Sequence, residues 1–535
     1  MEPELATANR PAASDTGSGI VKFVQAGMIG IVAWIDDAIV FSLAAGYLYL
    51  FNFRDGVFIW TLSQQEGGIT IDEAFRVLHG DVIYRDFFEF LTPGIVYINA
   101  FFLWLLGPTT TSVGLIVIII GALGTVATYA ISASVLARPW CFAPPAIFVG
   151  LTYPSYSQAN HKWPAIIFCL VAILAVVRTQ TRLRCAFSGF ALGCAMLSTQ
   201  DYGVGATFGM VLALWLLRER SASSGALICM ITSALTVASA MTALAIVAGF
   251  GNVWHDVVGF PLERYGLSQA FAFAFLGEQY FPLWLTAYGL GGLALLYTAI
   301  GIVRRFWRED PPSLVIIALT GAGLLVIGNT PHQIEPTLFA TGSVPLSIVG
   351  VYLLQRATQL RYAQPWLPIA LLGLGIIIAI HAISDPMPRG YGQPSLDRFT
   401  QSVHRAGKIW AASSQDDLTW VEANASEGEL VFLFPDKGGL YFLSRTRNAT
   451  SYAMMFDMGL YSDRQIADAI RQLTWKCPSV GIWDQGRLAS FVEKRPEWFT
   501  LKPLWLALSR DYDIAQNLPN HAYALRRKAI GCGLD

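Results

Sequence analysis

The stretch TIDEAFRVLHGDVIYRDFFEFLTPGIVYINAFFLWLLG, residues 70–107, decides how this chain is interpreted. It begins with adjacent acids, Asp72 and Glu73, and ends as an aromatic, apolar run. The pattern predicts a helix that opens with the acids and ends at Gly80, followed by a Pro-Gly break. The second helix, 94–106, has roughly 13 residues, which is too short to cross a bilayer, so we expect it to lie along a membrane surface.

Composition divides the chain into two parts. The 535 residues are 54% apolar and only 14% charged, whereas a soluble domain carries about a quarter charged residues. Of the 73 charged residues, 35 lie in 384–535, about 23% of that segment, and 38 lie in 1–383, about 10%. We therefore predict a multi-spanning membrane domain over 1–383 and a soluble domain over 384–535. The net charge of −1, with no basic run, gives no reason to expect a nucleic-acid partner.

Apolar stretches near the length of a membrane span recur through the first part. We expect about eleven spans, which makes the protein a polytopic α-helical membrane protein; the predicted spans are 38–58, 112–136, 141–158, 164–177, 185–200, 203–217, 225–250, 283–303, 312–328, 337–354 and 366–383. Every second connection is basic, with 13 Lys and Arg on one side and 5 on the other. The positive-inside rule then predicts a cytoplasmic N-terminus and an extracytoplasmic C-terminal domain, in the periplasm if the source is a bacterium with an inner membrane.

On this topology all seven histidines and most loop acids face outward. Ionisable residues at a membrane are costly and usually mark a working surface, although loops are also polar in general. Both explanations stay open, and the first predicts chemistry at the outer face.

The first outer loop carries a resemblance to a known family. An Asp-Glu pair, Gly80, the sequence Tyr84-Arg85-Asp86, a Pro-Gly break and an aromatic half-helix ending in Gly107 follow one another. This pattern resembles the GT-C superfamily of membrane glycosyltransferases, and more narrowly the branch of protein O-mannosyltransferases and lipid A aminoarabinose transferases. Weaker resemblance continues in GNVWHDVVGFPLERYG (251–266), HQIEP (332–336) and ELVFLFPDKGGLYFLSR (429–445).

The resemblance implies a sugar taken from a polyprenyl-phosphate carrier, an acidic motif in the first outer loop and a cytoplasmic N-terminus. Two positions depart from the family pattern. Where aminoarabinose-type members carry a second acid, this chain has Asn160-His161-Lys162-Trp163, and where many relatives have a basic residue it has Gln200-Asp201-Tyr202. The family's phosphate and metal arrangement therefore does not transfer whole.

Glycosyl transfer from a phosphate-linked donor needs a base for the acceptor hydroxyl and cations for the departing phosphate. By its match to the family position we expect Asp72 to be the base, with Glu73 as a second catalytic acid. The alternative is a capping box, in which Thr70 caps the helix and Glu73 reaches back to it.

Further residues are expected to bind the substrate: Tyr84, Arg85, Asp86, His161, Lys162, Arg264, Tyr265 and His332. For some of them a structural role is equally open. Arg85 and Asp86 can pair with each other, and a lysine at a membrane edge often reaches toward lipid headgroups. His332, Glu335 and His161 are of the right types for a divalent metal, which we leave open as a cofactor.

The C-terminal part alternates between strand and helix patterns. ELVFLF (429–434), SVGIWD (479–484) and Tyr523–Leu525 predict strands, and Ser462–Trp475 predicts an amphipathic helix, together a small α/β domain. It has no Gly-rich phosphate loop and no nucleophile elbow, so we expect it to shape the acceptor site. Cys477 and Cys532, the two cysteines of this domain, pair only if it is exported.

The sequence therefore predicts an integral membrane glycosyltransferase, inverting, that moves a sugar from a polyprenyl-phosphate donor to a lipid, glycan or protein hydroxyl. The expected location is the bacterial inner membrane, with the chemistry at its outer face. The alternatives are a transporter or flippase of lipid-linked sugars, which usually shows internal repeats that are not visible here, and an inactive scaffold of the same fold.

Overall fold

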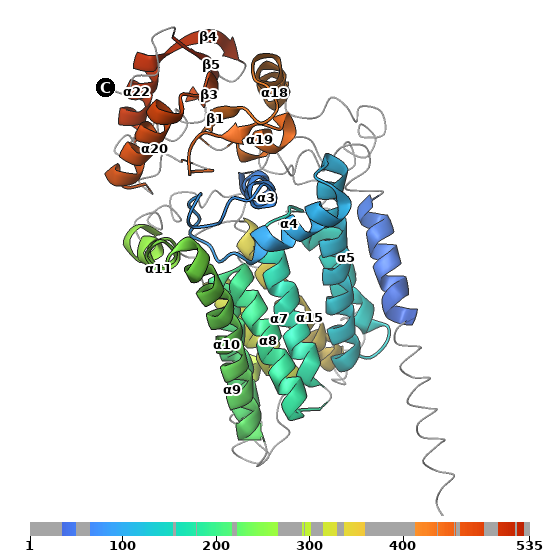
Figure 1. Ribbon diagram of the computed structural model, residues 1–535. Coiled ribbons are helices and arrows are strands. Elements are labelled where there is room, and N and C mark those ends of the chain that lie inside the picture. Colours follow the sequence, from blue (N-terminus) through green and yellow to red (C-terminus); the bar gives the residue numbers. More distant parts are fainter. Residues whose placement is uncertain are drawn as a thin grey trace, which may run out of the picture.

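The structure is a computed structural model in which a body of helices carries a small α/β domain at one end (Figure 1). It describes residues 35–49, 65–153, 157–177, 179–216, 222–265, 292–293, 295–300, 314–328, 336–358, 412–435, 437–453, 455, 461–485, 501–518 and 522–528.

The described body is helical, as the sequence predicted. Its helices are α4 (Gly94–Leu106), α5 (Thr110–Val135), α6 (Ala143–Ile147), α7 (Lys162–Val177), α8 (Arg182–Ser198), α9 (Gln200–Leu216), α10 (Ala222–Ala248), α11 (Phe250–Trp254), α14 (Leu314–Gly328) and α15 (Pro336–Thr358). The predicted span 141–158 is helical over Trp140–Thr152, where η3 (Trp140–Phe142), α6 and the π-helix η4 (Phe148–Thr152) follow directly on one another. Pro144 and Pro145 lie in the first turn of α6, where the N–H that proline lacks would have no partner within the helix. The predicted span 366–383 lies outside the described residues.

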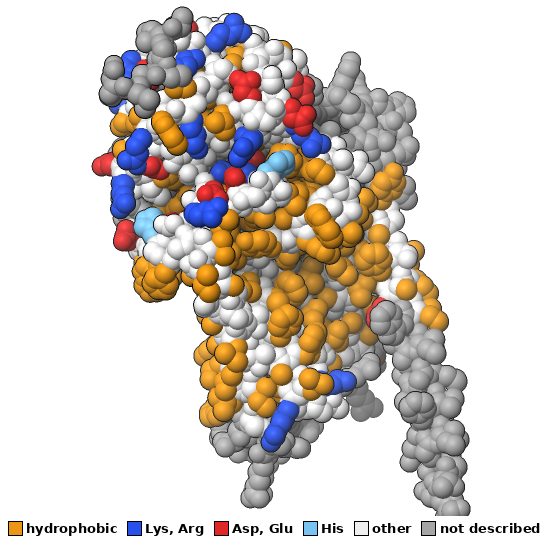
Figure 2. All heavy atoms as spheres, in the orientation of Figure 1, with side chains coloured by type: hydrophobic (Ala, Val, Ile, Leu, Met, Phe, Trp, Pro, Cys, Tyr) orange, Lys and Arg blue, Asp and Glu red, His pale blue; other side chains and the backbone are white. Residues whose placement is uncertain are grey.

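Two of the described helices, Thr110–Val135 and Ser224–Ala248, are long and apolar enough to cross a membrane. Hydrophobic side chains cover the helical body, whereas charged side chains gather over the α/β domain and the adjoining loop (Figure 2). The exposed apolar side chains of α10 include Leu235 at 63% and Ile246 at 79%. Such a surface is expected of a body that meets lipid, and the number of spans stays a prediction.

The short aromatic helix predicted from the Pro-Gly break is confirmed as α4. It begins at Gly94, ends before Gly107 (φ 84°) and lies across the ends of neighbouring helices (Figure 1). A side chain at Gly94 would meet the carbonyl oxygen of Leu197 in α8 at 2.4 Å, so only glycine permits this close crossing. Phe101 and Trp104 are 54% and 70% exposed, as expected of a helix at a membrane surface.

The C-terminal domain is a five-stranded sheet of order β2-β1-β3-β5-β4. Its elements are α18 (Ala412–Asn424), β1 (Leu430–Phe434), α19 (Gly438–Ser444), β2 (Arg447–Asn448), α20 (Asp463–Lys476), β3 (Val480–Asp484), α22 (Lys502–Asp511), β4 (Tyr512–Leu518) and β5 (Ala522–Arg527). β1 pairs in parallel with β2 and β3, and β5 pairs antiparallel with β3 and β4. The three predicted strands and the predicted helix are confirmed, while β2, β4, α18, α19 and α22 were not predicted.

Both faces of this sheet are covered, because alternate residues of each strand point to opposite sides. Phe432 and Phe434 pack with Trp483 against α20 and α22, whereas Val431 and Leu433 pack against α18 and α19. A capping box at Ser462 fixes the start of α20.

One helix lies between the two parts of the molecule. α3 (Gln65–Leu78) sits between the α/β domain and the helical body (Figure 1), and it packs against both α4 and α19. Because α3 contains Asp72 and Glu73, its surroundings decide what these acids can do.

Candidate functional site

The two acids lie in the middle of α3 and do not cap it. The helix begins at Gln65, five residues before Thr70, so Thr70 is already inside it. The Thr70 hydroxyl donates to the carbonyl of Ala159 at 2.7 Å rather than capping the helix. Asp72 and Glu73 are each only 1% exposed. The capping-box alternative is therefore wrong, and the burial of two acids needs another explanation.

Successive residues of a helix are rotated by about 100°, so Asp72 and Glu73 face different surroundings. Glu73 continues the row of Glu66 and Thr70, whose side chains contact the buried segment before α7. Asp72 shares its row with Ile69, which packs against Gly438 at the start of α19. One acid is therefore turned toward the helical body and the other toward the C-terminal domain.

Asp72 is a buried acid, and no cationic side chain of the described residues bonds it directly. Its Oδ2 has no hydrogen-bond partner among the described residues. Burial raises the pKa of Asp72 to about 7, with Asp81 adding to the rise and the Arg76 guanidinium opposing it. A carboxyl group that titrates near neutral pH can take up a proton and release it under physiological conditions, as a general base must.

Glu73 meets an acid that the sequence analysis did not nominate as a site residue, Glu89. Burial and the neighbouring Glu89 raise the pKa of Glu73 well above its usual value, and the two side chains share a hydrogen bond. Such a pair holds one proton between two carboxyl groups, since like charges at this distance cannot both ionise at low cost.

Asp256, in the segment that follows α11, lies beside Glu89, from whose backbone N–H it accepts a hydrogen bond. It accepts a hydrogen bond from Nδ1 of His255 at 2.8 Å. Burial raises the pKa of Asp256 to about 6, against the opposing effect of His255, and Glu89 contributes to the rise. Glu89 and Asp256 are 8% and 6% exposed. The only sequence signal was that both are acids in predicted outer loops, which many structural residues share.

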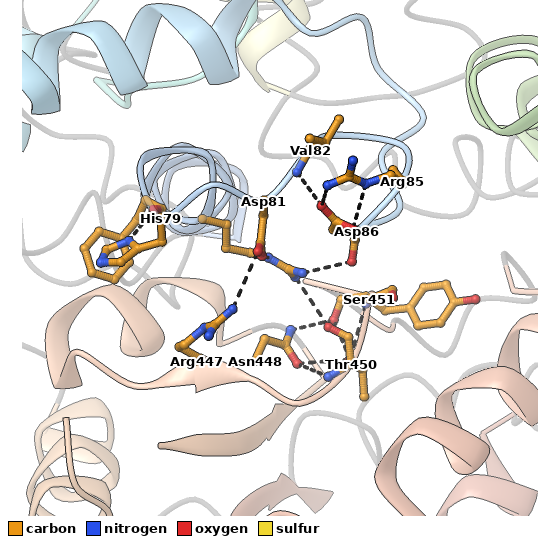
Figure 3. Close-up of polar contacts among 12 residues, drawn as sticks. His79, Asp81, Val82, Arg85, Asp86, Arg447, Asn448, Thr450 and Ser451 are labelled. Carbon is orange, nitrogen blue, oxygen red and sulfur yellow. Dashed lines mark hydrogen bonds and ion pairs between the residues drawn. The ribbon is translucent and has the colours of Figure 1, made fainter. Parts of the chain in front are cut away.

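The loop residues Tyr84, Arg85 and Asp86 brace the turn after α3. Tyr84 adopts a positive φ of 68°, and its hydroxyl donates to the carbonyl of Leu91 at 2.7 Å. Arg85 pairs with Asp86 at 2.8 Å, and Asp86 accepts the N–H of Val82 (Figure 3). The structural alternative raised for Arg85 and Asp86 is thus what the structure contains, and a role in substrate binding stays a prediction.

Lys162 is buried and engaged with an acid on α3. Its Nζ lies 2.9 Å from Oε1 of Glu66, and the amide of Asn160 donates to the other oxygen of Glu66 at 3.3 Å. His161 is buried beside it, at 6% exposure. Lys162 therefore does not reach toward lipid headgroups, and a donor phosphate would compete there with Glu66.

The other predicted binding residues are less well placed by the structure. Arg264 and Tyr265 belong to the π-turn η7 (Pro261–Tyr265), whose last two side chains lie outside the described atoms. His332 and Glu335 lie outside the described residues. Within the described part of the chain, no three His, Cys, Asp or Glu side chains converge as metal ligands.

The C-terminal domain closes over this site. The rings of Phe88 and Phe260 lie 4.8 Å apart, and Phe88 also packs against Tyr452 and Tyr461 of the C-terminal domain. Phe75 of α3 packs on Phe442 of α19, with ring centroids 5.4 Å apart. These contacts exclude water from the acids, which explains their raised pKa values.

The fold of the whole chain is similar to solved structures, while its sequence is not similar to known families. No protein-family model matches the chain, and no curated protein matches it. The oligosaccharyltransferase AglB of Archaeoglobus fulgidus, in complex with an inhibitory peptide and a dolichol-phosphate, matches with a TM-score of 0.55 and 13% identity, over 93% of this chain and 75% of that one. ArnT of Cupriavidus metallidurans bound to undecaprenyl phosphate matches with a TM-score of 0.54 and 10% identity, over 94% and 98%.

A second structure of ArnT, in the apo state, gives the same TM-score of 0.54 at 11% identity. Identities this low show the fold and not the activity. The resemblance predicted from the first outer loop is confirmed at that level: this chain has a GT-C-like fold.

Proposed function

We propose that this protein is an integral membrane glycosyltransferase that moves a sugar from a polyprenyl-phosphate carrier to a hydroxyl group of a lipid, glycan or protein. The observation that carries the proposal is Asp72 on a helix enclosed by a GT-C-like fold: burial raises its pKa to about 7, and one of its oxygens has no hydrogen-bond partner among the described residues. A raised pKa at an enclosed site is typical of catalytic groups.

The donor class is proposed from two structural neighbours. AglB is bound to a dolichol-phosphate and ArnT to undecaprenyl phosphate, both of which are polyprenyl phosphates. An apolar carrier chain fits the apolar surface of the helical body, on which Leu235 and Ile246 are exposed. The sugar and the acceptor stay open.

In the proposed reaction the Asp72 carboxylate takes the proton from the acceptor hydroxyl. The oxygen then attacks the anomeric carbon on the side opposite the phosphate, and the bond between that carbon and the phosphate oxygen breaks. The polyprenyl phosphate leaves with the electron pair, and the configuration at the anomeric carbon is inverted. We assign Glu73 and Glu89 to holding a proton beside the reacting groups, and Lys162 and Arg264 to the departing phosphate.

We place the site at the outer face of the bacterial inner membrane, with a cytoplasmic N-terminus and an extracytoplasmic C-terminal domain. Cys477 of this domain is disulfide-bonded, and Cys532 lies outside the described residues. Disulfides persist mainly in oxidising compartments, so this bond supports an exported domain.

The test is a transfer assay on the full chain in lipid nanodiscs, with radiolabelled polyprenyl-phosphate sugars as donors and membrane extract as acceptor. Asp72→Asn keeps the size of the side chain and removes the base, so transfer is expected to fall by about a hundredfold or more. The matched control is Asp463→Asn on the exposed first turn of α20, which should leave transfer unchanged.

Full transfer by the Asp72→Asn variant would show that Asp72 is not the base. No transfer by the folded wild-type protein with any donor would favour a flippase or an inactive scaffold.

A further inference from the structure

Arg76 occupies a position that connects the acid Asp72 to both parts of the molecule. It follows Asp72 by one helical turn, on the same row of α3. Its three guanidinium nitrogens each have a partner: Nε meets Asp81 at 2.9 Å, Nη2 donates to the carbonyl of Asp86 at 3.0 Å, and Nη1 donates to the carbonyl of Thr450 at 3.4 Å. The guanidinium also lies over the ring of Phe87, 4.7 Å from its centroid.

Thr450 belongs to the C-terminal domain, so the hydrogen bond from Nη1 of Arg76 crosses the boundary between the two parts of the molecule. The same boundary holds two further polar contacts. Arg447 pairs with Asp81 at 3.5 Å (Figure 3), and the N–H of Phe88 donates to the carbonyl of Ser451 at 2.8 Å. The side chain of Arg76 is only 12% exposed. A planar guanidinium group whose three nitrogens all have partners is held in one orientation. The bond to Thr450 means that the C-terminal domain helps to fix that orientation.

We propose that Arg76 is a positioning residue through which docking of the C-terminal domain sets the charge environment of the base Asp72. The proposal rests on the proposed function for its catalytic consequence, although its physical content can be measured without activity. Arg76 makes no hydrogen bond to Asp72 in the described contacts, so it acts through its charge and not by touching the reacting atoms.

The charged and titratable groups around Asp72 come from three elements. On α3 they are Arg76 and Glu73, in the loop after α3 Asp81, and on α19 the buried Tyr441. Arg76 is the cation among them, and it lowers the pKa of Asp72 against the effects of burial and of Asp81. When Arg76 is lost, or turns away because the C-terminal domain has undocked, Asp72 should keep its proton to a higher pH and cease to act as a base near neutrality.

Three variants separate charge from docking. Arg76→Gln removes the positive charge and shortens the side chain. Arg76→Lys keeps the positive charge but not the planar guanidinium group. Arg447→Gln breaks a boundary contact that does not involve Arg76. Hydrogen exchange of residues 447–452 in the full-length protein reports docking. Reaction with dicyclohexylcarbodiimide, which labels protonated buried carboxyl groups, reports the titration of Asp72, with Asp72→Asn used to distinguish it from labelling at Glu73.

In Arg76→Gln the midpoint of Asp72 labelling is expected to move up by roughly one pH unit, the low end of what a neighbouring charge produces. The acidic limb of transfer activity should move by the same amount, so that the loss is larger at pH 6 than at pH 8. Faster exchange at 447–452 should accompany it. Arg76→Lys should restore most of the midpoint, and Arg447→Gln, which loosens the boundary but keeps the cation, should speed exchange and raise the midpoint by less than Arg76→Gln does; faster exchange with an unchanged midpoint would overturn the proposal.

An unchanged labelling midpoint in folded Arg76→Gln protein would overturn the proposal, whatever its activity. A shifted midpoint with unchanged exchange at 447–452 would also overturn it, since Arg76 would then act without the C-terminal domain. If the midpoint shifts but the wild type transfers no sugar, the coupling stands and the proposed function fails.

Discussion

Two groups of buried acids lie close to α19, and they differ in whether a cation contacts the carboxyl groups directly. In the C-terminal domain, Nζ of Lys437 lies 2.6 Å from Asp417 and 2.9 Å from Asp484, so a cation sits between the two carboxylates. On α3 and the adjoining loops, Asp72, Glu73 and Glu89 are equally buried, but the cation beside Asp72 is turned toward other partners.

The difference shows in how the acids hold protons. Burial raises the pKa of Asp417, but the contact with Lys437 opposes the rise, and the pKa of Lys437 is itself raised by its two acids. Burial raises the pKa of Asp72 to about 7 and raises that of Glu73 well above its usual value. A buried acid with a bound cation stays charged and serves the structure, whereas a buried acid without one becomes a proton acceptor near neutral pH.

The largest effect that tests this comparison is expected from Lys437→Met. The substitution leaves Asp417 and Asp484 buried without their cation, which should destabilise the protein by about 3–5 kcal/mol. Differential scanning fluorimetry of the nanodisc-embedded protein should show a drop in Tm of roughly 10 °C. The control is Arg471→Met, which removes an exposed pair with Asp468 and should leave Tm within error. Equal effects of the two variants would mean that Lys437 does not hold the domain together.

The next effect concerns how stability depends on pH. The pKa of Asp72 is about 7 in the folded protein against an ordinary value of 3.8, so the folded state binds the extra proton between these limits. Stability from this group is therefore greatest below about pH 4 and falls as the pH rises toward 7, by up to about 4 kcal/mol.

Asp72→Asn should remove that part of the pH dependence. The expected result is a smaller difference in Tm between pH 5 and pH 8 than in the wild type, with the variant more stable at pH 8. Asp417→Asn, which removes a partner of Lys437, should lower Tm at both values. A wild-type pH dependence that persists in Asp72→Asn would show that Asp72 is already charged at pH 5.

The smallest effect should come from Gly438→Ala. Gly438 lies where the acid group around Lys437 meets the acid group on α3. Gly438 follows Lys437 and packs on Ile69, and a Cβ there would lie 3.0 Å from the Cα of Ile69. Overpacking of this size costs about 1–3 kcal/mol. Tm should fall by a few degrees, and hydrogen exchange in 438–444 should rise. The matched control is Gly46→Ala, because a Cβ at Gly46 meets open space. Gly428→Ala does not serve as a control, because the positive φ of Gly428 would strain an alanine. A silent Gly438→Ala variant would mean that α19 does not depend on close contact with α3.

Much of the fold could be predicted from sequence because it depends on local patterns. The helix α4 follows from a Pro-Gly break and an apolar run, and the strands near 429–434 and 479–484 follow from short apolar runs. The start of α3 was missed because Gly67 and Gly68 disfavour a helix by about 1 kcal/mol each. Both are buried in the structure, and packing between α4 and α19 outweighs this local preference.

Only part of the candidate site could be predicted from the sequence. Asp72 and Glu73 stood out because adjacent acids precede an aromatic half-helix. Glu89 did not stand out, because the sequence of a loop does not distinguish a functional acid from a structural one. The role of Glu89 becomes visible only when the fold places it beside Glu73. Asp256 joins from about 170 residues further along the chain, a separation at which no spacing rule applies.

The sequence by itself determined the division into an apolar helical part and a charged α/β part, the short surface helix and the presence of two adjacent acids. These depend on composition and on period, which neighbouring residues define. The tertiary structure alone decided that Asp72 faces the C-terminal domain while Glu73 meets Glu89. It also decided that Lys437 bonds two buried carboxylates, whereas Arg76 bonds Asp81 and two backbone carbonyls and makes no hydrogen bond to Asp72 among the described residues. The physical reason is that the pKa of an acid depends on burial and on the charges around it, and both are set by segments that meet only when the chain is folded.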